Sequence, residues 1–380
     1  MTQASVRPAI PLAMPDIRED DRRAVSEVLH SGRLALGPWA ERFEAKLAKA
    51  SGVEHAVVVS SGTSALHLVV RALGLGDGDE VITTPFSFVA SANCLLFERA
   101  TPVFVDVHPD SLCLDPECVA AAITPRTKAI LAVDVFGRPA NWPALATIAK
   151  EQGLVLIEDA AEALGSEHEG RRCGSFGAAA IYGFYPNKQI TTGEGGAVVT
   201  DDATLAKLCR SLANQGRDED ERWLRHSRVG FNYRMDEMSA ALGASQMDRL
   251  PEIVGRRREI ASWYADDFAG CDELRLPHEP PGASVSWFVY VVGVTLPGGR
   301  AVRDAVLAGL RREGIGCRDY FAPIHLQRPY RERFGYRRGQ FPICEEASER
   351  TLALPFFHQI DREDVVRVTG IVRRLLREAA

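Results

Sequence analysis

Three short segments carry residue types that could do chemistry together. Ser61, Gly62 and Thr63 lie in SSGTSAL, where an apolar run gives way to a helical pattern. Asp159 directly follows the apolar run LVLIE, and Lys188 lies in FYPNKQITTGEGG, just before a glycine-rich loop. Backbone N–H groups at a helix start bind anions, a buried carboxylate needs a partner, and a lysine in apolar surroundings can become a nucleophile.

Each of these residues also has an ordinary structural explanation. Serine and threonine are favoured helix N-caps, Asp159 could cap a helix in the same way, and a lysine in a loop is usually solvated. The combination is more informative than its members. An anion site, a carboxylate and a lysine, in that order on an α/β sheet, fit pyridoxal phosphate (PLP), which needs a phosphate site, an acid for its pyridinium nitrogen and a Schiff-base lysine.

The elements that would position these residues alternate between strands and helices. From residue 55 to about 200, short β-branched runs such as HAVVVSS and GLVLIEDAA are followed by helix-like segments. Consecutive apolar residues indicate strands that are buried on both faces, which is typical of a parallel α/β sheet. Ligands bind such sheets at the carboxyl ends of the strands, and the three segments begin there.

The second part of the chain predicts a smaller α+β lobe. DEMSAALGASQMDRL runs on into EIVGRRREIASWYADDF, so we expect one long helix that bridges two lobes. SWFVYVVGV predicts a strand, and REDVVRVTGIVRRLLREA predicts a terminal amphipathic helix. We therefore divide the chain into a large domain over residues 1–250, which carries the N-terminal arm, and a small domain over 251–380. The arm is expected to join the small lobe.

Composition excludes several classes of protein. The chain has 380 residues, 46% of them hydrophobic, and a formal net charge of −6. A basic footprint for nucleic acid is missing, and no apolar run has transmembrane length. The eight cysteines include no C-x-x-C pair, so we expect reduced thiols, no metal site and a cytoplasmic protein.

With these motifs in place, the sequence resembles the DegT/DnrJ/EryC1/StrS family of PLP-dependent sugar aminotransferases. The resemblance covers nearly the whole chain. Its motifs are SGRLALGP, SSGTSALHL, TTPFSFVASAN, EDAAEALGS, FYPNKQITTGEGGAVVTDD, GFNYRMDEMSAALGASQMDRL and YFAPIHLQ. The family implies the type I (aspartate aminotransferase) fold, with a mainly parallel seven-stranded sheet in the large domain.

The resemblance also implies roles for the cofactor site. Lys188 would be the Schiff-base lysine and proton shuttle, and Asp159 would pair with the pyridine nitrogen. Phe88 would stack on the cofactor ring. The phosphate would lie against the helix start at Ser61, Gly62 and Thr63. Asn232 would reach the phosphate of the neighbouring subunit's cofactor, so the family implies a homodimer with shared sites.

Two positions depart from the commonest pattern of the family. Gly183 stands where many relatives have a serine that contacts the phosphate. Glu162 stands where many have glutamine or histidine near the phenolic oxygen of the cofactor. An ionised carboxylate would be repelled there, so we expect Glu162 to be protonated, turned away or used for the substrate.

The form of EDAAEALGS, together with GCRDYFAPIH, looks most like the perosamine synthase branch. That branch implies amination at C4 of a nucleotide-linked 4-keto-6-deoxy sugar, with L-glutamate as donor. Arg234 and Arg318 could meet a diphosphate or form surface ion pairs, and His325 could contact the substrate or be structural. The nucleotide stays open among GDP, UDP and dTDP.

Other functions remain open on the same scaffold. A C3 keto sugar or a keto-cyclitol could be the acceptor, and sequence separates these poorly. A PLP-dependent sugar dehydratase of the family typically has histidine in place of Lys188. A sensor without catalysis would not need an intact pair of Lys188 and Asp159.

Overall fold

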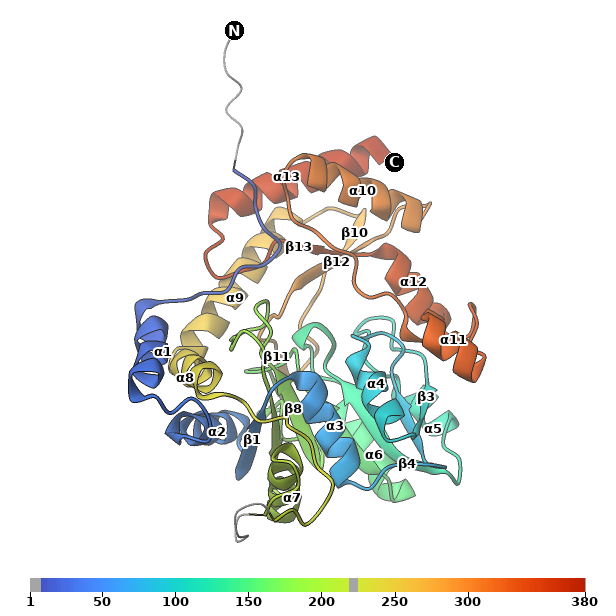
Figure 1. The fold of residues 1–380 in the computed structure, drawn as a ribbon. Helices are drawn as coiled ribbons and strands as arrows, with labels where there is room; N and C mark the ends of the chain where they lie inside the picture. The colour runs from blue at the N-terminus through green and yellow to red at the C-terminus, as the bar shows by residue number, and fades with distance from the viewer. Residues whose placement is uncertain (1–7, 219–224, 380) are drawn as a thin grey trace.

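The computed structural model describes residues 8–218 and 225–379 as two stacked lobes (Figure 1). The large lobe is built on a seven-stranded sheet with the order β1-β9-β8-β5-β4-β2-β3. Only β9 runs against its neighbours β1 and β8, so the sheet is mainly parallel and the predicted fold class is confirmed. The strands are β1 His55–Val59, β2 Glu80–Thr83, β3 Thr101–Phe104, β4 Thr127–Val133, β5 Val155–Asp159, β8 Ala179–Gly183 and β9 Gly196–Thr200.

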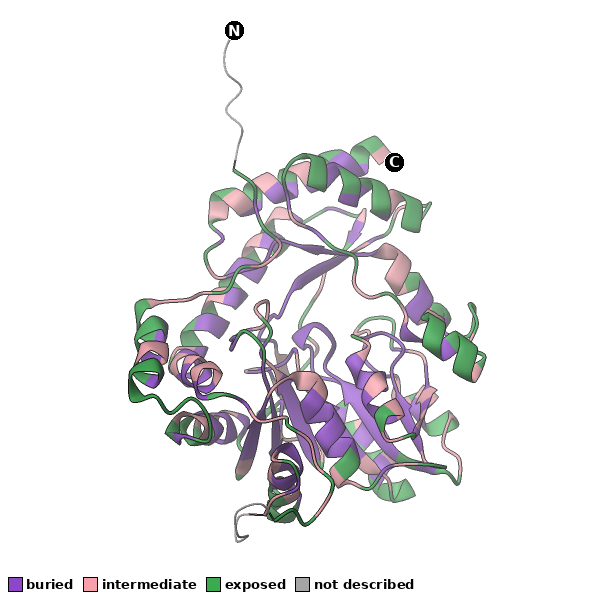
Figure 2. Ribbon diagram, viewed as in Figure 1, coloured by how far each residue is buried: buried purple, intermediate pink, exposed green. Residues whose placement is uncertain are grey.

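Helices cover both faces of this sheet, which leaves its strands almost wholly buried (Figure 2). Val57 and Val59 of β1 belong to one buried cluster and Ala56 and Val58 to another, because side chains alternate along a strand. Two buried faces explain the continuous apolar runs in the sequence. The helices of this lobe are α2 Pro38–Ser51, α3 Gly62–Ala72, α4 Ala90–Phe97, α5 Pro116–Ala121, α6 Trp142–Gln152, α7 Ala203–Ala213 and α8 Glu237–Met247.

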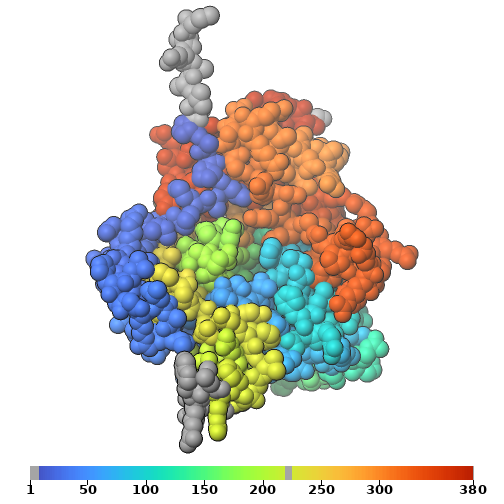
Figure 3. Space-filling view, in the orientation of Figure 1, coloured from blue at the N-terminus to red at the C-terminus, as the bar shows by residue number. Residues whose placement is uncertain are grey.

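The small lobe packs helices on a three-stranded sheet with the order β10-β12-β13. The N-terminal arm joins it as expected, because Ile10 pairs with Ile315 and lies in the core of the small lobe. Figure 3 shows the arm running over the surface of this lobe before α1, Glu19–Ser31. The elements of the lobe are α9 Leu250–Asp267, β10 Leu274–Arg275, β12 Tyr290–Val294, α10 Arg300–Arg312, β13 Thr351–Leu354 and α13 Arg362–Ala379.

The remaining short elements link the lobes. A second three-stranded sheet joins β6 Glu167–His168, β7 Arg171–Arg172 and β11 Ala283–Ser284. Two helices lie among the small-lobe elements in the chain but pack on the core of the large lobe. Their residues Tyr330 and Cys344 belong to the large-lobe cluster. The two helices are α11 Arg328–Phe334 and α12 Pro342–Arg350.

The prediction of one long helix across the lobes was wrong. α8 ends at Met247 and α9 begins at Leu250, with Pro251 in its first turn. Proline lacks the N–H that would continue a helix from the preceding turn, so it starts a helix more readily than it extends one. α9 still links the lobes, because Ile253 contacts the large-lobe core and Tyr264 the small-lobe core.

All eight cysteines are free thiols. Within the described ranges, no helix is both long and apolar enough to cross a membrane.

Candidate active site

The predicted residues gather at one edge of the large sheet. β1 and β8 both run antiparallel to β9, and β5 runs parallel to β8, so β1, β5 and β8 share one direction. Their carboxyl ends meet at the same edge, where ligands bind α/β sheets. Ser61 follows β1, Asp159 ends β5, and Lys188 lies in the loop between β8 and β9.

The start of α3 forms a capped helix terminus at this edge. Ser61 Oγ accepts a hydrogen bond from Ser64 N at 3.0 Å, and Ser64 Oγ accepts one from Ser61 N at 2.9 Å. The N-cap considered for Ser61 is therefore confirmed. The N–H groups of Gly62 and Thr63 lie in the first turn, where a helix offers no acceptor, so they remain available to an anion.

Glycines leave space beside this helix start. A Cβ atom at Gly62 would lie 3.3 Å from the Cα of Gly183, which is a close approach of α3 to the end of β8. A Cβ atom at Gly183 would meet only Ala161 Cβ at 3.6 Å and Gly62 Cα at 3.9 Å, which are ordinary contacts. Position 183 therefore has room for the Cβ atom of the serine that many relatives carry.

Asp159 is a buried carboxylate with two internal donors. Its Oδ2 accepts a hydrogen bond from Ser91 Oγ at 2.7 Å, and its Oδ1 accepts one from Ala161 N at 3.1 Å. Burial raises the pKa of Asp159, while these two bonds and the charge of Lys188 oppose the rise. Among the described residues, no cationic side chain lies within the 4.0 Å of an ion pair with Asp159. A carboxylate has about four acceptor sites, so Asp159 can still accept from a protonated ring nitrogen.

Lys188 is enclosed between a carboxylate and an aromatic ring. Its Nζ lies 3.4 Å from Glu162 Oε1 and 3.9 Å from the ring centre of Phe288. The other oxygen of Glu162 accepts a hydrogen bond from Phe136 N at 2.8 Å. The carboxylate of Glu162 is thus held between the lysine amine and the turn that carries Phe136.

Arg257 anchors the lysine loop from the other lobe. From α9 it donates to the carbonyl oxygens of Lys188, Trp287 and Phe288, each at 3.1 Å. Burial lowers the pKa of Arg257 to about 10. The sequence analysis missed this residue because it lies in the run GRRRE, which resembles a solvated helix face. Its long-range partners give no local signal.

Two predicted cofactor residues lie at the surface of the single chain. Phe88 is 62% exposed, although the turn that carries it lies beside Asp159 through a 3.1 Å contact between Ser87 Oγ and Ser91 Oγ. Asn232 is exposed and pairs with Asn214 through the backbone. Both side chains are therefore accessible to a partner surface.

The two predicted substrate arginines lie on different lobes. Arg234 donates from Nη1 to Asn214 Oδ1 at 3.1 Å. Arg318 is exposed and pairs through its backbone with Ala353 of β13. Two residues after Arg318, burial raises the pKa of Tyr320, and the negative charge of Glu162 adds to the rise. The segment that carries Arg318 therefore approaches the lysine site from the small lobe.

His325 has no exposed surface. Its Nε2 lies 3.1 Å from Glu345 Oε1, and its ring packs edge-on against Phe341 with the ring centres 4.7 Å apart. Burial lowers the pKa of His325. This surrounding gives His325 a packing role in the structure and leaves no free face for a substrate.

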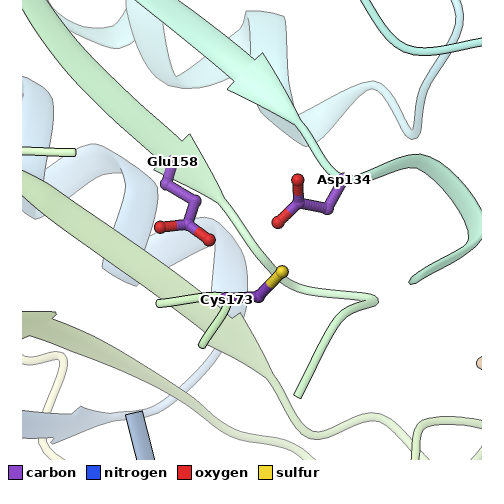
Figure 4. Close-up of side chains that lie close together, drawn as sticks. All are labelled: Asp134, Glu158 and Cys173. Carbon is purple, nitrogen blue, oxygen red and sulfur yellow. The ribbon is translucent and has the colours of Figure 1, made fainter. Parts of the chain in front are cut away.

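A second acidic group lies on the opposite face of the same sheet, and the sequence analysis did not predict it. Figure 4 shows Asp134, Glu158 and Cys173 pointing toward one another, with their ligand-type atoms all within 4.8 Å. Burial raises the pKa of Asp134 to about 7, and burial together with the neighbouring Asp134 raises the pKa of Glu158. The two carboxyl groups therefore hold at least one proton between them near neutral pH.

The partners of this acidic group are all internal. Glu158 accepts hydrogen bonds from Gly174 N at 2.6 Å and Phe176 N at 2.8 Å. Asp134 Oδ1 accepts from Ala140 N at 2.9 Å and Trp142 Nε1 at 3.0 Å. The group is closed off by the packing around it and serves the fold of the lobe.

A seven-stranded, mainly parallel sheet with a small second lobe, and with a lysine and a carboxylate at its carboxyl edge, defines a protein of the type I aminotransferase fold. Within that class, the chain belongs to the DegT/DnrJ/EryC1/StrS aminotransferase family, whose sequence profile matches residues 15–373. It is an aminotransferase.

Three relatives illustrate the match. The UDP-N-acetyl-3-dehydro-alpha-D-glucosamine 3-aminotransferase of Acidithiobacillus ferrooxidans is 36% identical over 99% of this chain and 100% of its own. DesV of S. venezuelae, solved with a ketimine intermediate, is 36% identical with a TM-score of 0.91 over 97% and 99% of the two chains. Spr1654 of Streptococcus pneumoniae, solved in its PMP form, is 25% identical with a TM-score of 0.94 over 98% and 100%.

Proposed function

We propose that this aminotransferase uses PLP to transfer an amino group from L-glutamate to C4 of a nucleotide-linked 4-keto-6-deoxy sugar. The acceptor chemistry rests on the resemblance of EDAAEALGS and GCRDYFAPIH to the perosamine synthase branch. The observation that carries the proposal is the meeting of Lys188, Asp159 and the start of α3 at one sheet edge. These three groups match the three polar parts of the cofactor.

The residues of the edge fit the cofactor on physical grounds. Gly62 lets the start of α3 approach the end of β8 closely, and the N–H groups of Gly62 and Thr63 have no acceptor within the helix, which suits a phosphate. Asp159 is buried with spare acceptor capacity and no cationic partner in the described chain, which suits a protonated ring nitrogen. When bound, PLP supplies an electron sink that stabilises the carbanion formed at the amino-bearing carbon.

The protein would contribute position and proton transfer. Lys188 Nζ would attach the cofactor and, once released, move a proton at the reacting carbon. Glu162 would hold the free amine in place, since its Oε1 lies 3.4 Å from Nζ. Arg257 would keep the lysine loop at a fixed distance from the small lobe through its bond to the Lys188 carbonyl. A 1 Å error in such positioning can cost about a hundredfold in rate.

The substrate would enter from the side of the small lobe. Arg234 and Arg318 would meet the diphosphate of the sugar nucleotide, because guanidinium forks pair well with phosphate oxygens. Phe88 and Asn232 are accessible in one chain. We propose that a second copy covers them and that Asn232 reaches the cofactor phosphate of that copy, so that the working unit is a homodimer.

A second acceptor is a 3-keto sugar nucleotide. The specific observation in its favour is the relative from Acidithiobacillus ferrooxidans, which is a 3-aminotransferase for a UDP sugar. The two candidates share the cofactor site and differ only in which carbon of the sugar faces it.

The test is a panel of 4-keto and 3-keto sugar nucleotides carrying GDP, UDP or dTDP, with L-glutamate as donor and NMR of the product. We expect amination of a 4-keto sugar, and its loss in Lys188→Ala. Lys207→Ala, an exposed lysine on α7, is the matched control and should keep full activity. Amination confined to 3-keto sugars would replace the C4 proposal, and native turnover by Lys188→Ala would overturn the site.

A further inference from the structure

A pocket of about 400 Å³ lies between the two lobes, apart from the lysine site. Its walls come from the loop after β3, the turn after β4, the open face of β12 and α12. The turn after β4 separates it from Lys188. Phe136 of this turn lines the pocket, while its backbone N–H donates to Glu162 on the other side.

Arg138, at the end of this turn, is a buried cation with no counter-ion among the residues that the structure describes. Its side chain is 5% exposed, and its one hydrogen bond runs from Nη1 to the carbonyl oxygen of Asp110 at 3.1 Å. Its Nε is buried with no partner. Among the described residues, no carboxylate lies within 4.0 Å of the guanidinium. A buried charge is costly unless it is paired, so an anion that binds beside this arginine would offset part of the cost of burying it.

The rest of the pocket does not neutralise that charge. Arg275 at the rim is paired with Asp110 at 3.4 Å, and Arg350 is paired with Glu346 at 2.9 Å. Three arginines thus face two carboxylates, and the excess positive charge belongs to Arg138, the most buried of the three. An anion that entered the pocket would meet a guanidinium with unused donors.

The remaining lining is largely apolar. Leu112, Leu276, Val291 and Ile343 line the pocket together with Phe136. Water alone would satisfy the arginine poorly against such walls, whereas a molecule with one anionic end and an apolar body would satisfy both parts. Pockets of this size and mixed lining are typical of small-molecule sites.

We propose that this pocket between the lobes binds a small organic anion, a carboxylate or phosphate monoester with a compact apolar body, through Arg138. The site is separate from the lysine site and does not depend on the proposed sugar acceptor.

The test uses the PLP-loaded protein and three probes with one apolar body: benzoate, phenyl phosphate and the neutral benzamide. We expect at least one of the two anions to bind at least tenfold more tightly than benzamide by ligand-observed NMR titration. Which anion binds more tightly distinguishes carboxylate from phosphate recognition. Unchanged cofactor absorbance during the titration would place the probe outside the lysine site.

Variants make the assignment specific. Arg138→Gln should lower the affinity for the anion at least tenfold and leave the affinity for benzamide unchanged. Arg275→Gln, at the exposed rim, should lower the affinity for the anion about threefold. It tests the proposal if Arg138→Gln does not fold. Arg300→Gln, an exposed arginine on α10 away from the pocket, is the matched control and should change nothing. Equal affinity for anions and benzamide, or anion binding that neither pocket variant alters, would overturn the proposal.

Discussion

Glu158 and Asp159 are consecutive buried acids at the end of β5, yet their surroundings differ sharply. Side chains alternate along a strand, so the two point to opposite faces of the sheet. Glu158 meets another acid, Asp134, and two backbone donors inside the lobe. Asp159 accepts a hydrogen bond from Ser91 and lies near enough to Lys188 for the lysine's charge to oppose the rise in pKa that burial causes.

Burial raises the pKa of both acids, so burial does not distinguish Asp159, which we propose binds the cofactor, from Glu158 inside the lobe. The two acids differ in how many of their acceptor sites already have a donor. Glu158 has donors on both oxygens and a proton-sharing neighbour, whereas Asp159 has spare acceptor sites at the edge where ligands bind. Arg138 resembles Asp159 in this respect, because it is a buried charged group with an unused hydrogen-bonding site, but its charge is positive.

The largest effect is expected from substituting the two acids at the end of β5. Asp159→Asn should lower turnover by at least about a hundredfold, since the loss of one preorganised electrostatic partner typically costs that much. Glu158→Gln leaves one backbone donor facing the amide NH2, so it should lower stability by about 1–3 kcal/mol, but the folded variant should stay within about threefold of native turnover because Glu158 faces away from the lysine site. Steady-state kinetics of both purified variants decide the matter. Equal losses in the two variants would remove the distinction drawn here.

The acidic pair should also leave a mark on stability. The pKa of Asp134 is raised from its ordinary 3.8 to about 7, so the folded protein holds a proton that the unfolded chain releases. The free energy of unfolding contributed by this pair therefore falls as pH rises from about 4 to about 7, and changes little above that.

Asp134→Asn should reduce that fall, because an amide stays neutral while its oxygen still accepts from Trp142. We expect the variant to lose less stability than the native protein between pH 5 and pH 8, by about 1 kcal/mol or more, since one pKa unit corresponds to about 1.4 kcal/mol. Urea unfolding at several pH values measures it. Asp77→Asn, an exposed acid paired with Arg99, is the control. Parallel curves for Asp134→Asn and the native protein would contradict the shared proton.

A smaller effect is expected at Glu162. Glu162→Gln keeps an acceptor for the N–H of Phe136 but removes the charge beside Lys188. The ion pair is largely buried, but its N–O distance of 3.4 Å is longer than that of a strong hydrogen bond. We therefore expect a cost of about 1 kcal/mol and a fall in turnover of no more than about fivefold, with the change in kcat rather than KM. A loss as large as that of Asp159→Asn would make Glu162 an essential catalytic group instead.

A gain is expected at Gly183. A Cβ atom at this position would make only ordinary contacts beside α3, and the hydroxyl of Gly183→Ser would donate to the cofactor phosphate. One added hydrogen bond contributes about 0.5–1.5 kcal/mol, or roughly twofold to tenfold in the Kd of PLP. Equilibrium dialysis of PLP against both proteins measures it, and weaker binding by the serine variant would show that the space is already needed for something else.

Part of this site was predictable from the sequence and part was not. Lys188 and Asp159 could be found because Asp159 ends a strand and Lys188 lies in the loop after one, and strand ends in α/β sheets are where ligands bind. Arg257 and Phe288 could not, since each reaches Lys188 from another lobe across 69 and 100 residues. The loop contacts that join them carry no periodic pattern.

The acidic group shows the same limit in another form. Asp134, Glu158 and Cys173 come from three separate segments, and only the pairing of β4 with β5 brings the first two together. The break between α8 and α9 was locally visible at Pro251, but the helical pattern on both sides was read as continuous. Periodicity predicts helices well and their ends less well.

The account depends most on Lys188 as the residue that holds the cofactor. Borohydride reduction of the PLP-loaded protein, followed by peptide mass spectrometry, fixes the cofactor on the lysine that carries it. We predict the label on the peptide that contains Lys188, with no label in Lys188→Ala and native labelling in Lys207→Ala. A label on another of the chain's lysines, or stable labelling of Lys188→Ala, would contradict the account.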